Sequence, residues 1–266
     1  MSAALVAVLA TGALIVVATL ADWSSFAAMA PGIMSRLLPA LLVNTGAATV
    51  ASLEGAITRS GAVGGALIGM TIYLGAGWEG WTLLCATFAC ALVASRVGSD
   101  RKKALGIAQE DEGARGAWHA VANCGIAAAA AVVAATSPHQ SAAWLALVTA
   151  LTAGGADTAA SEIGKAWGRR TVLIVGLKRV APGTSGGISL EGSIANVIAA
   201  TGLAALGAAL GLIAGRAVPV VVVAALVGAS LESVLGATLE PAGILNNHLL
   251  NFINTAAAAA VAVYLI

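Results

Sequence analysis

The stretch AVPVVVVAALVGASLESVL, residues 217–235, decides the class of this protein. It carries a single ionisable side chain, Glu232, among residues that are otherwise apolar or small. A helix needs about 20 such residues to cross the hydrocarbon core of a bilayer. Comparable apolar runs lie at about residues 3–21, 37–56, 61–77, 80–95, 117–136, 142–160, 192–214 and 249–266. We therefore expect an all-α fold, a polytopic membrane helix bundle with about eight to nine transmembrane helices.

The composition excludes most other classes of protein. Of the 266 residues, 59% are hydrophobic and 9% are charged, and the mean hydropathy is +0.95, whereas a soluble domain carries about 25% charged residues. The net charge of +1 shows no basic excess, so nucleic acid is not an expected partner. We expect a single transmembrane domain over residues 1–266 that contacts membrane lipids. Whether it forms a homo-oligomer is left open.

The distribution of cationic residues predicts how the helices are oriented. Ten of the thirteen Lys and Arg residues lie in two stretches, as Arg96, Arg101, Lys102, Lys103 and Arg115, and as Lys165, Arg169, Arg170, Lys178 and Arg179. Two predicted crossings separate these stretches, so both can lie on one side. The excess of positive charge in cytoplasmic loops then predicts that the loops at about 96–116 and 165–191 face the cytoplasm. We expect a multi-pass protein of the cytoplasmic membrane with its active site on the cytoplasmic face.

One polar cluster, within residues 155–165, lies near the end of an apolar run. Asp157 and Ser161 share a helix face, with Glu162 one position round and Lys165 one turn further. Ionisable groups at membrane depth are costly, so they favour a functional site over a solvated helix end, which is the alternative. Carboxylates beside an ammonium group suit Mg²⁺ together with phosphate oxygens. We expect Asp157 and Glu162 to be metal ligands and Glu232 to supply a third carboxylate.

A glycine-rich segment, KRVAPGTSGGISLEG at residues 178–192, follows this cluster. Glycines allow successive backbone N–H groups to point at an anion, and the segment leads into a helix whose N-terminus favours negative charge. We expect Lys178 and the residues Gly183, Thr184, Ser185, Gly186 and Gly187 to bind a nucleotide's phosphates, in a loop that packs no core. The alternative is a flexible turn.

Further polar residues lie in two other predicted helices. Arg115, at the start of one, could clamp a phosphate through two hydrogen bonds, and Asn123 follows it at helical spacing. Asn247 and Asn251 form a polar stripe with Asn254. Such a stripe is either a contact between helices or a contact to substrate.

Two features favour architecture over chemistry. Gly61, Gly65 and Gly69 recur at every fourth residue, a spacing that predicts close helix packing in a membrane. His119 stands alone among apolar residues, and a histidine in that setting is more often a packing residue than a base.

Five segments follow one another in the order known from one family. They are RGAxxxVANxG (Arg115 to Gly125), ADTxASEIG (Ala156 to Gly164), PGTSGGISxEG (Pro182 to Gly192), ESxLGAT (Glu232 to Thr238) and LLNFIN (Leu249 to Asn254). In these motifs the chain resembles the phytyl-phosphate kinase family of integral membrane proteins, although Glu232 stands where that family more often has Asp. The resemblance implies a phosphotransferase that converts an isoprenyl monophosphate to the diphosphate, with CTP as donor.

The residues and the resemblance together predict one site. Asp157, Glu162, Lys165 and Arg115 would carry out catalysis with Mg²⁺, and the glycine-rich loop and Lys178 would hold CTP. Asn123, Asn247 and Asn251 would contact the lipid-like isoprenyl phosphate. A membrane transporter of a small solute and a CTP-using cytidylyltransferase are the alternatives.

Overall fold

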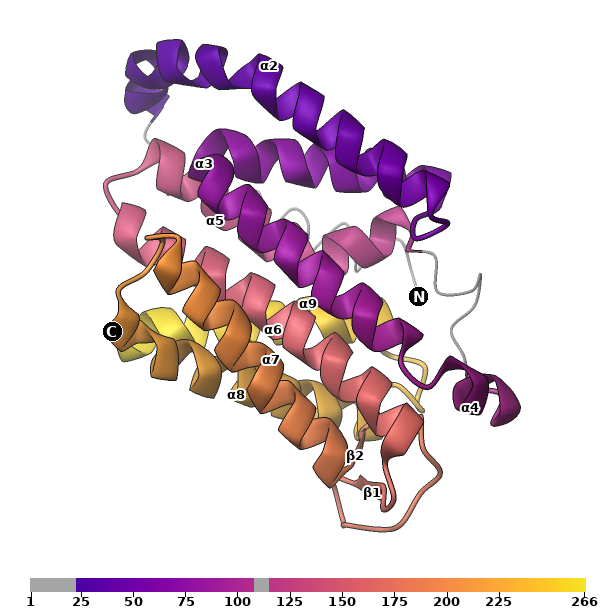
Figure 1. The fold of residues 1–266 in the computed structure, drawn as a ribbon. Coiled ribbons are helices and arrows are strands. Elements are labelled where there is room, and N and C mark those ends of the chain that lie inside the picture. Colours follow the sequence, from indigo (N-terminus) through magenta and orange to yellow (C-terminus); the bar gives the residue numbers. More distant parts are fainter. Residues whose placement is uncertain (1–22, 108–114) are drawn as a thin grey trace.

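The computed structural model describes residues 23–107 and 115–266. The expected first span, at residues 3–21, and the acidic residues Glu110 to Glu112 lie outside the described residues. The described chain is a bundle of long helices with one very small sheet (Figure 1). The helices are α2 (Trp23–Leu53), α3 (Arg59–Arg96), α4 (Ser99–Ala104), α5 (Ala117–Thr136), α6 (Gln140–Trp167), α7 (Leu190–Ala209), α8 (Val218–Thr238) and α9 (Asn247–Leu265). A 3₁₀ turn, Gly215–Ala217, precedes α8, and the strands β1 (Val172–Leu173) and β2 (Gly187–Ile188) pair antiparallel.

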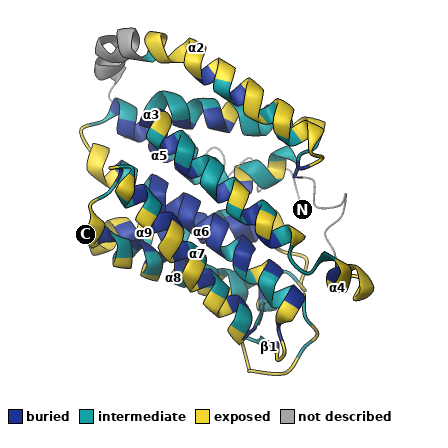
Figure 2. Cartoon of the chain, in the orientation of Figure 1, coloured by how far each residue is buried: buried dark blue, intermediate teal, exposed yellow. Residues whose placement is uncertain are grey.

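Six helices in the described residues are long and apolar enough to cross a membrane, namely α2, α3, α5, α7, α8 and α9. Their outer surfaces carry large apolar side chains such as Leu42, Ile198 and Val223, which are exposed in the isolated chain. The exposed residues lie on the outside of the bundle (Figure 2). This pattern is the one expected of a protein whose solvent is lipid, so the predicted fold class is confirmed.

The helix α3 has two halves joined by a sharp kink. Gly77 has φ 68° and ψ −166°, a backbone conformation that only glycine adopts readily. Both ends of α3 consequently lie beside Arg115: Thr58 N donates to the Arg115 carbonyl at 3.1 Å, and Arg115 Nη2 donates to Ser95 Oγ at 3.1 Å. The kink lies at the boundary between the two predicted spans at residues 61–77 and 80–95. That each half crosses the membrane separately stays a prediction.

The helix α6 is the centre of the bundle. It packs against α3, α5, α7, α8 and α9, and nearly every residue from Leu145 to Thr158 is buried (Figure 2). A helix that is apolar on all sides is stable in such a position. Because α6 lies between the other helices, polar side chains near its C-terminal end are placed where several elements meet.

The polar connections gather at one end of the bundle. The helix α4 and the strands β1 and β2 lie there (Figure 1), and Lys102 of α4 contacts Glu162 of α6. Ser185, in the segment between β1 and β2, donates to Glu240 beyond α8. The structure thus confirms that the two cation-rich loops share one end, while the side of the membrane that this end faces stays a prediction.

Candidate active site

A polar cavity of about 470 Å³ opens at this end of the bundle. Its walls are the C-terminal half of α6, the first turns of α7, the end of α8, the start of α9 and the segment 171–189. Of the expected site residues, it brings together Asp157, Lys165, Glu232, Asn247, Asn251 and the loop residues 183–187. Segments far apart in the sequence therefore form one concave site, which we call the polar cavity.

A pair of carboxyl groups is the chemical centre of the polar cavity. Asp157 of α6 and Glu232 of α8 lie close enough to share a hydrogen bond. Asn254 Nδ2 donates to Glu232 Oε2 at 2.8 Å and orients that carboxyl group. Two ionised carboxylates within hydrogen-bonding reach repel each other unless a proton or a cation lies between them. The pair therefore offers hard oxygen ligands of the kind that Mg²⁺ prefers.

Glu162 does not belong to this pair. Its Oε2 lies 2.6 Å from Lys102 Nζ and its Oε1 lies 3.0 Å from Lys165 Nζ, and its side chain is only 2% exposed. Five positions along a helix turn a side chain about 140°, so Glu162 points away from Asp157, toward α4. Among the described residues, no three His, Cys, Asp or Glu side chains form a group that could hold a metal ion. The expected ligand set of Asp157, Glu162 and Glu232 is therefore not assembled.

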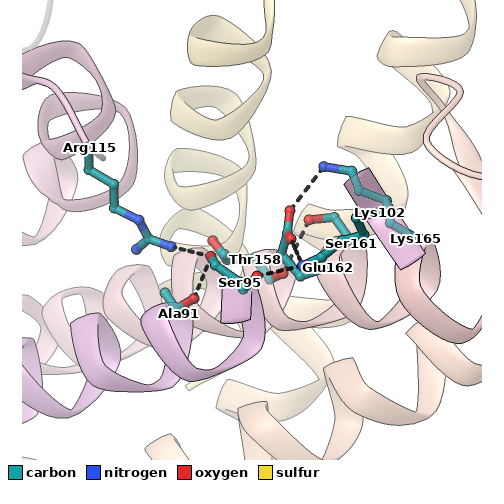
Figure 3. Close-up of polar contacts among 8 residues, drawn as sticks. All are labelled: Ala91, Ser95, Lys102, Arg115, Thr158, Ser161, Glu162 and Lys165. Atoms are coloured by element: carbon teal, nitrogen blue, oxygen red, sulfur yellow. Dashed lines mark hydrogen bonds and ion pairs between the residues drawn. The ribbon is translucent and has the colours of Figure 1, made fainter. Parts of the chain in front are cut away.

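Glu162 instead joins a buried polar chain (Figure 3). Lys102 Nζ also donates to the Ser95 carbonyl at 2.6 Å, and Ser95 Oγ accepts from Arg115. The chain therefore runs from Arg115 through Ser95, Lys102 and Glu162 to Lys165. It fixes the ammonium group of Lys165 at the wall of the polar cavity, where that residue is part of the lining.

The glycine-rich loop lines the polar cavity, but its glycines also pack against α8. Gly186 has φ 72°, and a Cβ atom there would lie 2.5 Å from the Ser233 carbonyl oxygen. The expectation that this loop packs no core is wrong, because its backbone lies directly against a transmembrane helix. The amides of Thr184 and Gly187 bond to carbonyls of the segment itself, at 3.2 and 2.9 Å, which leaves fewer N–H groups for an anion than expected.

Lys178 is not at the site. It lies at the exposed tip of the segment between β1 and β2, next to Leu177 and Gly176, which both have positive φ. The described residues that line the polar cavity do not include Lys178. The tip is a tight turn closed by the hydrogen bond from Leu173 N to Lys178 O at 2.9 Å and by the bridge between Val172 and Arg179. The pattern Lys178-Arg179 by itself does not reveal this turn.

Sequence reasoning missed several residues of the polar cavity. Ser189, Ser193 and Asn196 line it from α7, and Ser189 Oγ caps that helix by accepting from Gly192 N at 3.2 Å. These three residues have the same helical spacing as Asn247, Asn251 and Asn254. The polar stripe that indicates Asn247 and Asn251 is therefore visible here in the sequence as well. Glu240, which accepts from Ser185, stands in a connection and carried no such signal.

Arg115 and Asn123 line a different cavity. This apolar cavity, of about 190 Å³, lies between α2, α3, α5 and α6. Arg115 is 7% exposed, and its guanidinium lies 5.7 Å from the centre of the Phe88 ring. His119 and Thr158 line both cavities. The expected clamp is thus next to the polar cavity rather than inside it.

The fold and the site define an integral membrane protein with two adjoining cavities, one polar and one apolar, at one end of a helical bundle. The chain belongs to the integral membrane protein family DUF92, whose model matches residues 42–259. This membership agrees with the resemblance drawn from the five motifs.

The chain is similar to several proteins of known sequence. It is 38% identical over 200 residues to the uncharacterized membrane protein sll0875 of Synechocystis, covering 74% of this chain and 78% of that protein. It is 34% identical over 217 residues to protein VTE6, chloroplastic, of Arabidopsis thaliana, covering 78% of this chain and 64% of that protein. Protein PGR of Arabidopsis thaliana is 28% identical over 236 residues, covering 78% and 80%. No solved structure matches the chain.

Proposed function

We propose that this protein is a membrane kinase that transfers a phosphoryl group from CTP to an isoprenyl monophosphate. The observation that carries the proposal is the Asp157–Glu232 carboxyl pair, which faces Lys165 in a polar cavity at one end of a membrane bundle. Phosphoryl transfer requires positioning and neutralisation of charge more than covalent chemistry. The five motifs shared with the phytyl-phosphate kinases support the choice of reaction and of a prenyl acceptor.

The donor chemistry of the carboxyl pair fits Mg²⁺, which proteins hold with one or two carboxylates plus phosphate oxygens. Asp157 and Glu232 would hold the ion, and Asn254 would keep the Glu232 carboxyl group oriented. When bound, Mg²⁺ supplies charge neutralisation for the phosphates.

The chain's own residues supply the remaining interactions. The ammonium group of Lys165, held by Glu162 at 3.0 Å, is placed to pair with a phosphate oxygen. The hydroxyl groups of Ser189 and Ser193 lie at the N-terminal turn of α7, a place that favours anions. A phosphate acceptor is already ionised near neutral pH, so the reaction needs no strong general base, and His119 has no such role in this proposal.

A product assay tests the proposal. Purified protein in lipid nanodiscs is incubated with Mg²⁺, labelled CTP and a panel of isoprenyl monophosphates. Release of CDP together with an isoprenyl diphosphate is the expected result. Release of pyrophosphate would identify a cytidylyltransferase instead, and turnover of neither kind would favour a transporter.

The substitution Asp157→Asn tests the site itself. It removes one negative charge at nearly constant volume, so CDP release should fall at least about a hundredfold while the thermal unfolding temperature changes little. Asp100→Asn, on the exposed surface of α4, is the matched control and should keep full activity. Normal turnover by Asp157→Asn would contradict the assignment of the carboxyl pair.

A further inference from the structure

We propose that the apolar cavity between α2, α3, α5 and α6 binds the isoprenoid chain of the acceptor, and that Arg115 binds its phosphate. This inference rests on the proposed function, because it takes the acceptor to be an isoprenyl monophosphate. It adds a binding site, a residue for the head group and a wall that limits the size of the chain.

The walls of the apolar cavity leave room for a chain. Small residues of α3 and α6, among them Gly61, Gly65 and Gly155, form much of the lining. A Cβ atom at Gly65 would meet no atom of the described residues within 4 Å, apart from the backbone of its own helix, so the space beside it is open. Gly65 was expected to pack against another helix, and the structure instead shows it facing this open space. Val63 and Leu67, which are 64% and 62% exposed, lie about 200° round the helix from Gly65, so the lipid-facing side of α3 is opposite the cavity.

The far end of the apolar cavity is closed. Trp81 Nε1 donates to Asn44 Oδ1 at 3.2 Å, and both residues line the cavity. The lining residues of α3 between Gly61 and Ile68 span about 10 Å along the helix. The cavity therefore accommodates the part of a chain nearest its phosphate, and its closed end limits how far the chain enters.

Arg115 provides a charge for the head group. Its guanidinium is buried, and Nε has no hydrogen-bond partner among the described residues. A buried cation with an unused donor is costly unless an anion completes its bonding. A phosphate group matches the planar arrangement of guanidinium donors. An apolar cavity with one buried guanidinium is thus complementary to a lipid that carries a single phosphate group.

The apolar cavity adjoins the polar cavity in which the proposed reaction takes place. They share the residues His119 and Thr158 in their linings, and Thr158 directly follows Asp157. His119 Nε2 also has no hydrogen-bond partner among the described residues. A phosphate bound by Arg115 would therefore lie beside the wall that adjoins the polar cavity.

The first test fills the apolar cavity. Binding of tritiated farnesyl monophosphate is measured on purified protein in nanodiscs without nucleotide. Gly65→Leu places a side chain in the open space and should weaken binding at least tenfold. Gly202→Leu is the matched control, at an exposed position of α7 where a Cβ atom would meet no described residue outside its own helix. It should bind as the unchanged protein does.

The second test separates the head group from the chain. Arg115→Gln should weaken binding of farnesyl monophosphate at least tenfold and leave binding of farnesol, which has no phosphate, within twofold. A loss of affinity for both compounds would mean that Arg115 only maintains the structure, and this would overturn its assignment. Arg115→Lys keeps the charge and should give an intermediate loss for the phosphate compound.

The outcomes distinguish this inference from the proposed function. If Gly65→Leu binds farnesyl monophosphate normally while the unchanged protein releases CDP, the cavity assignment is overturned and the kinase proposal stands. If Gly65→Leu abolishes lipid binding while the unchanged protein releases no CDP, the cavity is supported and the kinase proposal fails. Displacement of the probe by oleoyl lysophosphatidic acid as readily as by farnesyl monophosphate would overturn the isoprenoid specificity.

Discussion

The ammonium group of Lys102 is buried although it belongs to the cationic run Arg101-Lys102-Lys103, whose other members are exposed. Gly98, with φ 61°, turns the chain into α4, and a Cβ atom there would lie 2.6 Å from the Cβ of Ala166. This close approach directs Lys102 into the bundle, where it contacts both Glu162 and the Ser95 carbonyl. In the sequence Lys102 resembles a solvated surface residue, but in the structure it pairs with Glu162, and Glu162 in turn pairs with Lys165.

Lys102→Met tests this role at the scale of a single residue. Removing one partner of a buried ion pair leaves a poorly compensated charge, so the free energy of unfolding should fall by about 3 kcal/mol. The neighbouring substitution Lys103→Met removes an equal charge from an exposed position and should leave the unfolding temperature unchanged. Thermal unfolding of the purified proteins measures the difference.

The double substitution Lys102→Met with Glu162→Gln removes both members of the pair. It should recover part of the lost stability, because no unpaired charge is left in the interior. Equal unfolding temperatures for Lys102→Met and Lys103→Met would show that the buried pair contributes nothing.

At the scale of elements, close backbone contacts between α6, α7, α8 and the loop shape the polar cavity. A Cβ atom at Gly192 of α7 would lie 2.7 Å from the Ala160 carbonyl of α6, and one at Gly236 of α8 would lie 2.7 Å from Ser185 Oγ. Glycine is required where two backbones approach this closely. These contacts bring the start of α7 and the glycine-rich loop to the carboxyl pair.

Gly186→Val tests the contact between the loop and α8. The side chain would collide with α8, so the loop should be displaced, with loss of both thermal stability and CTP affinity. Gly176→Val lies in the same segment with a similar positive φ of 79°, but its Cβ would meet no atom within 4 Å in the part of the chain that the structure describes. This control isolates the backbone strain of about 1–2 kcal/mol. Equal effects of the two substitutions on CTP binding would show that the contact with α8 does not position the site.

At the scale of the whole molecule, the loops around α4 and around β1 and β2 lie at one end of the bundle, and both cavities adjoin that end. The connection between α5 and α6 and the connection between α7 and α8 lie at the other end (Figure 1). In the proposed function, with this end facing the cytoplasm as predicted, the nucleotide and the lipid reach neighbouring cavities without either crossing the membrane.

Single-cysteine labelling tests this topology. In a background without native cysteines, Lys103→Cys and Lys178→Cys should react with an impermeant maleimide only in inverted vesicles, because positively charged loops are retained inside. His139→Cys and Arg216→Cys, at exposed positions of the opposite end, should react in intact cells. Reaction of Lys103→Cys and Lys178→Cys on opposite sides would contradict the fold, whereas reaction of both from outside would contradict only the orientation.

Much of the fold and part of the candidate site follow from the sequence. The described spans agree with the apolar runs because burial in lipid depends on local composition over about 20 residues. The split at Gly77 is also a local property of one backbone position. Four site residues could be identified because each is polar within an apolar helix, where burying a polar group is costly unless it has a function. They are Asp157, Glu232, Asn247 and Asn251.

The partners of these residues could not be predicted in the same way. Glu162 was grouped with Asp157 because the two are close in sequence, yet they point to different sides of α6. Lys178 is grouped with the loop for the same reason, yet the tight turn that joins it to Leu173 holds it at the exposed tip. Lys102 and Glu240 gave no signal, since a charged residue in a connection is usually solvated.

The sequence by itself determined that this chain is a bundle of membrane helices with ionisable groups at a few fixed depths, because hydropathy and helical periodicity act over neighbouring residues. Only the tertiary structure decided which of those groups meet. The choice of Glu232 rather than Glu162 as the neighbour of Asp157, the use of Lys102 to pair with Glu162, and the division of the site into a polar and an apolar cavity all depend on how helices pack around α6. That packing is set by close approach at glycines and by side-chain direction around each helix, which are properties of several segments at once.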